Sequence, residues 1–191
     1  SVLLALAMTL ALSVSALAAG NGTITVDNPK ANETYTAYKI FDVSYNADKT
    51  AYSYTIKSDS AWFATVKAFA DIAANGLTLT EAAGTPGTYV VTTDKFSAPE
   101  FAKALQTALK DNATLKATGI ALEAKGDGTV SKDNLDLGYY FVSSDTGALC
   151  NLTTTNPTVT IHDKNDIPFD KVDDKESVDV GEVVTYTITG K

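Results

Sequence analysis

The sequence predicts a mainly β protein, a sandwich of sheets with two short helices inserted between its strands. Apolar and polar residues alternate over short segments, which is typical of strands with one buried face. The 191 residues include 27 threonines, nine tyrosines and seven phenylalanines, and β-branched and aromatic side chains favour strands. Two segments place their apolar residues at helical spacing instead, and they predict the inserted helices.

Strands are expected wherever this alternation holds. They are residues 23–26, 35–43, 51–56, 89–91, 119–123, 129–130, 137–143, 158–164 and 183–189. The strongest candidate is residues 35–43, YTAYKIFDV, because alternate residues of a strand share one face. That face is expected to hold Tyr35, Ala37, Lys39, Phe41 and Val43. All but Lys39 are apolar or small.

Two helices are expected between strands. The first covers residues 59–74, with Ser58 or Asp59 as N-cap, Gly76 past its end, and an apolar stripe of Trp62, Val66, Phe69 and Ala73. The second covers residues 98–110, with Ser97 as N-cap, Pro99 in its first turn, and a stripe of Phe101, Leu105 and Leu109. With the strand pattern, these helices predict an immunoglobulin-like sandwich over about residues 22–165.

The chain is expected to be exported and to divide into two domains. Residues 2–19 carry no charge and end in Ala16-Leu17-Ala18, the A-x-A pattern of a signal-peptide cleavage site. We therefore predict a signal peptide over residues 1–19, without its basic n-region. A transmembrane anchor is the alternative. Residues 20–166 are then the N-terminal domain, and residues 167–191 are the truncated start of a second.

Composition argues against several classes of function. A net charge of −8 disfavours nucleic-acid binding, which needs a basic surface to neutralise phosphates. The single cysteine excludes an intrachain disulfide, and the single histidine excludes a multi-histidine metal centre. The sequence has no glycine-rich phosphate loop and no G-x-S-x-G motif. We therefore expect no enzyme activity, cofactor, metal or small-molecule substrate.

The most informative segment is residues 157–165, PTVTIHDKN. Val159 and Ile161 set the inward side of this strand, and the same alternation directs Asn165 inward and Lys164 to solvent. Lys39 also falls on an apolar strand face. Burial lowers the pKa of a lysine and favours its neutral, nucleophilic amine. The alternative is that Lys39 extends from a half-exposed strand into solvent.

The chain resembles the N-terminal part of a Gram-positive sortase-assembled major pilin, the backbone subunit of a fimbria. The features are the signal peptide, TITVDNPKANETYTAYKIFDV, LGYYFVSS, TTNPTVTIHDKN, and IPFDKVDDKESVDVGEVVTYTITG at the start of the next domain. In that family a motif close to V-Y-P-K-N ends the first domain, and sortase joins its lysine to the neighbouring subunit. This chain has I-H-D-K-N, so His162-Asp163 replaces Tyr-Pro.

The resemblance implies roles for individual residues. Lys164 would be the lysine joined to the next subunit, with Lys171 and Lys175 as competing amines. Lys39 and Asn165 would form an internal isopeptide bond promoted by a buried acid, for which Glu123 is a candidate although its strand parity opposes that of Ile120 and Leu122. Lys171 would serve the corresponding bond of the following, CnaB-type domain.

The resemblance also implies partners and a location. The partners would be a sortase and identical subunits, and the location would be a cell-wall-anchored pilus on the surface of a Gram-positive bacterium. The alternative function is a wall-anchored adhesin built from the same domains, which would bind host surface ligands. A shaft subunit needs an acceptor lysine, whereas an adhesin does not.

Overall fold

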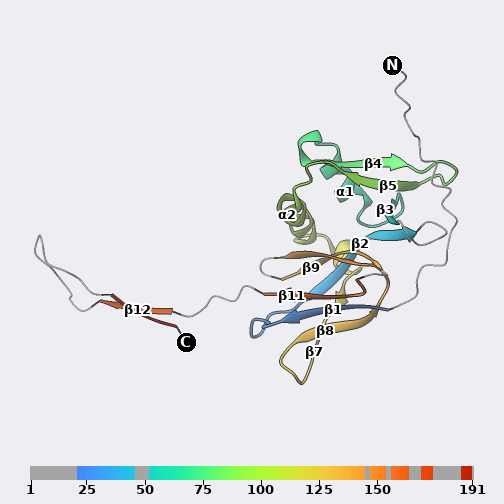
Figure 1. Ribbon diagram of the computed structural model, residues 1–191. Helices are drawn as coiled ribbons and strands as arrows, with labels where there is room; N and C mark the ends of the chain where they lie inside the picture. Colours follow the sequence, from blue (N-terminus) through green and yellow to red (C-terminus); the bar gives the residue numbers. More distant parts are fainter. Residues whose placement is uncertain are drawn as a thin grey trace, which may run out of the picture.

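The computed structural model describes residues 21–45, 52–144, 147–153, 156–163, 169–173 and 186–190, the last two segments by their backbone alone. It is mainly β and contains two packed sheets (Figure 1). The prediction of a mainly β sandwich with few helices is therefore confirmed. The predicted signal peptide lies outside the described residues.

The smaller sheet contains four strands in the order β11-β1-β8-β7. Their bounds are β1 Gly22–Asp27, β7 Glu123–Ala124, β8 Val130–Leu135 and β11 Thr158–His162. β1 and β11 run parallel, whereas β1 and β8 are antiparallel. β11 therefore forms one edge of this sheet.

The larger sheet follows the order β10-β9-β2-β3-β5-β4, with β6 also paired to β2. Its strands are β2 Thr36–Tyr45, β3 Tyr52–Lys57, β4 Leu77–Glu81, β5 Thr88–Thr93, β6 Ile120–Ala121, β9 Gly138–Ser143 and β10 Ala148–Leu152. β4 and β10 were not predicted. Both are edge strands, and β10 packs beside β11 of the other sheet.

Apolar side chains fill both faces of the larger sheet. One core lies against the smaller sheet and includes Ile24, Val26, Tyr140 and Leu152. The other core lies against the helices and includes Trp62, Phe101, Leu105 and Phe141. The helices thus form a third layer, opposite the smaller sheet (Figure 1).

β2 contributes to both cores. An irregularity in its pairing with β9, between Lys39 and Phe41, shifts the strand register by one residue. Such a bulge interrupts the alternation of side chains. Phe41 consequently packs in the helix-covered core, whereas Ala37 packs in the core between the sheets. The prediction that these two residues share one face is wrong for this reason.

The helices occur where their stripes predicted them, although the first is shorter than expected. α1 covers Phe63–Ala70 and is followed by a 3-10 turn, η1, at Ala73–Asn75. Trp62, rather than Ser58 or Asp59, stands at its N-cap. Gly76 ends η1 with φ of 67°, and a Cβ there would lie 2.0 Å from the carbonyl oxygen of Asp94. Only glycine fits this position.

α2 covers Ala98–Leu109, close to the predicted range, with Pro99 in its first turn and Phe101, Leu105 and Leu109 buried. Ser97 is its N-cap residue but makes no side-chain capping bond. A short helix, α3 at Ala113–Lys116, was not predicted. Asn112 caps it by accepting a hydrogen bond from the backbone N–H of Leu115.

Beyond residue 163 the structure describes one antiparallel hairpin. It consists of β12 Phe169–Asp173 and β13 Tyr186–Gly190, with Lys171 opposite Ile188. The hairpin lies within residues 167–191, which the sequence assigns to a second domain. That assignment stays a prediction.

Candidate functional site

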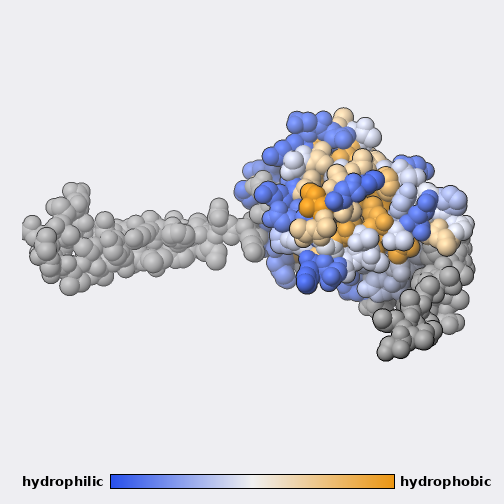
Figure 2. All heavy atoms as spheres, turned by 90° about the horizontal axis from the view of Figure 1, so that it is seen from above, coloured by the Kyte–Doolittle hydropathy of each residue, from blue (hydrophilic) through white to orange (hydrophobic). Residues whose placement is uncertain are grey.

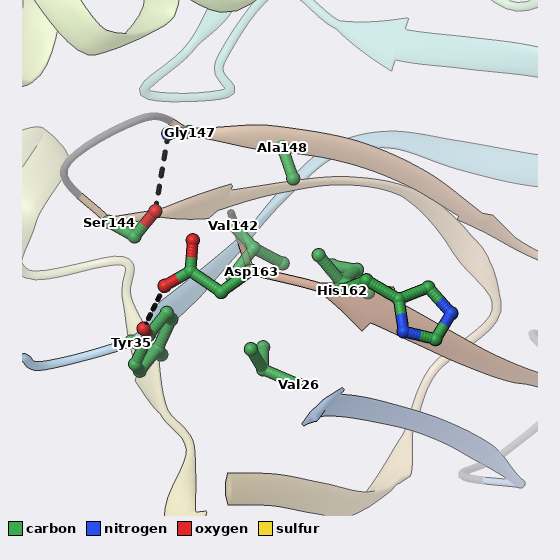
Figure 3. Close-up of a pocket in the computed structure, with 9 residues that line it drawn as sticks. Val26, Tyr35, Val142, Ser144, Gly147, Ala148, His162 and Asp163 are labelled. Carbon is green, nitrogen blue, oxygen red and sulfur yellow. Dashed lines mark hydrogen bonds between the residues drawn. The ribbon is translucent and has the colours of Figure 1, made fainter. Parts of the chain in front are cut away.

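A cavity of about 370 Å³ opens where the edge strands β10 and β11 meet. Its walls come from both sheets and from the turn between β9 and β10. The lining residues are Val26, Tyr35, Val142, Ser144, Gly147, Ala148, Ile161, His162 and Asp163 (Figure 3). We call it the edge groove. Asp163, the last of these lining residues in sequence, directly precedes Lys164.

β11 brings Ile161, His162 and Asp163, the residues directly before the predicted acceptor Lys164, to the edge groove. Its side chains alternate, with Thr158, Thr160 and His162 exposed and Val159 and Ile161 packed against the core between the sheets. This confirms the predicted alternation up to residue 162, and Asp163 is again half-buried. Lys164 and Asn165 lie outside the described residues, so their outward and inward directions stay predictions.

Tyr35 connects β11 to the start of β2. Its side chain is buried, and its hydroxyl donates a hydrogen bond to Oδ2 of Asp163. The hydroxyl oxygen of Tyr35 also accepts a hydrogen bond of 2.9 Å from the backbone N–H of Lys30. Burial, followed by the bond to Asp163, raises the pKa of Tyr35 to about 12. The phenol therefore remains a donor at neutral pH. Figure 3 shows the carboxylate of Asp163 directed toward this hydroxyl.

His162 and Asp27 face each other across β11 and β1. They are register partners, and Nδ1 of His162 lies 2.6 Å from Oδ2 of Asp27. The imidazole is largely exposed, and its ring points away from the centre of the groove (Figure 3). This contact joins the two strands at the end of the sheet where the groove opens.

The structure does not give Lys39 the apolar surroundings that its strand position predicted. Its side chain is 25% exposed, and its Nζ lies 2.6 Å from Asp42 Oδ1 and 3.8 Å from Asp136 Oδ2. It therefore extends to the surface as an ion-paired lysine, which is the alternative left open above. The Lys39–Asn165 bond itself is untested, because Asn165 lies outside the described residues.

Glu123 is not a buried acid. Its side chain is 62% exposed on β7 and lies 2.6 Å from the ammonium of Lys132. The hydrogen bond and charge of Lys132 lower the pKa of Glu123. β7 and β11 form opposite edges of the smaller sheet, so Glu123 is not part of the edge groove. Neighbouring residues of a strand point to opposite faces, so the place of Glu123 next to the buried Leu122 already indicated an outward-facing side chain.

Two of the other hollows lie along α2. One, of about 610 Å³, includes Lys103, Gln106, Lys110 and Gly147. The other, of about 580 Å³, lies between α1 and α2 beside Ile72, which is 56% exposed. Figure 2 shows hydrophobic residues gathered on the face viewed from above, bordered by hydrophilic ones.

The described residues contain neither a metal-binding cluster nor a membrane-spanning helix. They contain no cluster of three or more histidine, cysteine, aspartate or glutamate side chains that could hold a metal ion. Within the same residues, no helix combines the length and apolar character needed to cross a bilayer. Cys150 is buried, which raises its pKa to about 12 and keeps the thiol protonated.

Sequence reasoning did not assign a role to Tyr35 or to the turn before β10, although both line the groove. Tyr35 and Asp163 are 128 residues apart, and no local pattern reveals such a pairing.

Comparison with known proteins adds no assignment: no protein-family model matches the chain, and no curated protein is significantly similar to it.

Proposed function

We propose that the chain is the N-terminal part of a structural subunit of a covalently polymerised surface pilus, with an immunoglobulin-like first domain. The observation that carries the proposal is the edge groove, which lies at the end of β11 immediately before Lys164. An acceptor lysine must reach a substrate held by another protein. Lys164 follows the groove residue Asp163 directly in sequence and stands where we expect the first domain to end, and such a position would permit that approach.

The reaction is transfer of an acyl group to an amine. A sortase holds the threonine of a neighbouring subunit as a thioester on its cysteine. The neutral amine of Lys164 attacks the carbonyl carbon, the tetrahedral intermediate expels the cysteine thiolate, and the nitrogen loses a proton to leave an amide. An exposed lysine is mostly protonated at neutral pH, so the sortase must remove the proton or select the neutral fraction.

The edge groove provides space for the segment that precedes the threonine. Its walls combine apolar side chains, such as Val26, Val142 and Ile161, with the polar groups of Ser144 and Asp163. Among the described strands, β10 and β11 are both sheet edges, so each has one side along which no other described strand is paired. These features suit an extended peptide.

Coexpression of the full-length protein with its sortase tests the proposal. We expect high-molecular-weight ladders from the wild type and from Lys171→Ala, and none from Lys164→Ala. Lys175→Ala is a matched control from the same segment. Persistence of the ladders in Lys164→Ala would show that another amine is the acceptor. A wall-anchored adhesin, the alternative, would appear on the cell wall as a single species without ladders.

A further inference from the structure

We propose that Tyr45 and Tyr52 form an oxidative crosslinking site, at which a one-electron oxidant of phenols joins the two rings as an internal dityrosine. The inference goes beyond the proposed function, because it concerns the pairing of β2 with β3 and needs neither a sortase nor a second subunit. The oxidant is of the haem-peroxidase class, which consumes hydrogen peroxide.

The two tyrosines lie opposite each other on neighbouring strands. Tyr45 is the last residue of β2 and Tyr52 the first of β3, and they are register partners in the antiparallel pairing of these strands. Side chains directly opposite in such a pair have Cβ atoms only about 4.5–5.5 Å apart. The two ring centroids are 6.0 Å apart, and the ring planes are inclined by 53°. The rings are therefore in contact across the strands.

Tyr52 is accessible to an oxidant in solution. Its exposed fraction is 47%, whereas the other tyrosines in the described residues are buried or half-buried. Tyr45 is 8% exposed and belongs to the core between the sheets. Tyr52 is therefore the phenol that meets the oxidant, and Tyr45 is the fixed partner beside it. An exposed side chain changes rotamer rapidly, so the ring of Tyr52 can close the remaining distance to Tyr45.

Tyr54 is the competing partner, since its ring centroid lies 5.6 Å from that of Tyr52. Coupling joins the carbons ortho to the two oxygens, which lie on the ring edges. The Tyr52–Tyr54 pair is T-shaped, at 73°, so an edge meets a face instead. Tyr54 is also enclosed by Phe41 and Tyr139. Burial raises the pKa of Tyr54 to about 12, so the proton that must leave on oxidation is held more firmly. Tyr45 is therefore the favoured partner.

Coupling removes two electrons and two protons from the pair of phenols. Each phenol loses one electron and one proton to become a phenoxyl radical, and the ortho carbons of the two rings form the new C–C bond. The hydrogen on each of these carbons then moves as a proton to the oxygen of its own ring, which restores both phenols. Hydrogen peroxide takes up the two electrons and two protons and becomes two molecules of water. The product is two hydrogen atoms lighter than the unreacted chain.

The test is oxidation of dilute full-length protein by a haem peroxidase and hydrogen peroxide, followed by dityrosine fluorescence and mass spectrometry of peptides. We expect a monomeric product that is lighter by two hydrogen atoms and yields a crosslinked peptide carrying Tyr45 and Tyr52. Tyr45→Phe and Tyr52→Phe should each lose this product, because phenylalanine has no phenol to oxidise. Each variant keeps the ring, and Tyr52→Phe changes an exposed position, so the fold should be retained.

Two further variants are matched controls. Tyr54→Phe removes the competing phenol, and Tyr89→Phe removes a half-buried phenol whose ring neighbour is Phe63, at 5.0 Å. Both should keep the wild-type yield of the Tyr45–Tyr52 product. Loss of that product in Tyr54→Phe, its persistence in Tyr45→Phe, dityrosine only between separate chains, or a wild-type chain without dityrosine would each overturn the inference.

Discussion

The described domain should lose stability in alkaline solution because several buried acids must ionise when it unfolds. Burial raises the pKa of the Cys150 thiol to about 12 from 9.0, and it raises the pKa values of Tyr54 and Tyr139 to about 12 from 10.0. The pKa of Tyr35 is also raised from 10.0 to about 12. Each folded-state pKa lies above the unfolded one. The neutral forms therefore stabilise the fold fully below pH 9, and that contribution is lost as the pH rises toward 12.

The size of the loss follows from about 1.36 kcal/mol for each pH unit between the unfolded and folded pKa values. At pH 11 the thiol of Cys150 alone accounts for about 3 kcal/mol. The tyrosines account for about 1 kcal/mol each, less where the phenol reaches solvent. The total of about 6 kcal/mol is comparable to the whole stability of a typical domain, about 5–15 kcal/mol. Unfolding near pH 11 is therefore expected.

Urea titrations at pH 8, 9, 10 and 11 measure this effect directly. The free energy of unfolding should fall from pH 9 onward, first through Cys150 and above pH 10 through the tyrosines. Cys150→Ala is the control, because it should remove the decrease between pH 9 and 10 while the later decrease remains. Equal stability of the wild type at pH 8 and 11, or an unchanged slope in Cys150→Ala, would refute the reasoning.

Four further outcomes are expected. Gly76→Ala should destabilise the domain by at least about 2 kcal/mol, because φ of 67° and the nearby Asp94 carbonyl exclude a Cβ; an unchanged melting temperature would contradict this. Leu105→Ala, at a fully buried position of α2, should cost about 2–5 kcal/mol in urea unfolding. Glu123→Gln should leave the melting temperature unchanged, because the ion pair with Lys132 is exposed. The Lys39–Asn165 bond predicts an intact mass lower by one ammonia, restored in Lys39→Ala; separate, unlinked Lys39 and Asn165 peptides would exclude it.

Features set by local sequence were predictable. α2 begins near its Pro99 and buries the three residues that its spacing indicated. β11 alternates as Thr158, Val159 and Thr160 predicted. In both cases the periodicity of apolar residues is enough to predict which residues are buried, because each element buries one face. The position of β11 beside a groove was not accessible in this way.

Features that depend on pairing between distant segments were not predictable. The bulge beside Lys39 arises from the register between β2 and β9, and it moves Phe41 to the other core. Lys39 lies close to Asp42, three positions away, and also near Asp136, almost a hundred positions along the chain. These two carboxylates stand where the strand pattern suggested apolar surroundings, and the second of them could not be placed from local sequence. β4, by contrast, alternates in sequence as LTLTE, so a signal for it was present.

The most direct test of the proposed pilus function is mass spectrometry of peptides released from polymers formed on the cell wall. The account predicts a branched peptide in which the side-chain nitrogen of Lys164 is joined to the carboxyl group of a threonine. A branch on Lys171 or Lys175, or wall-attached protein without any branched peptide, would contradict it.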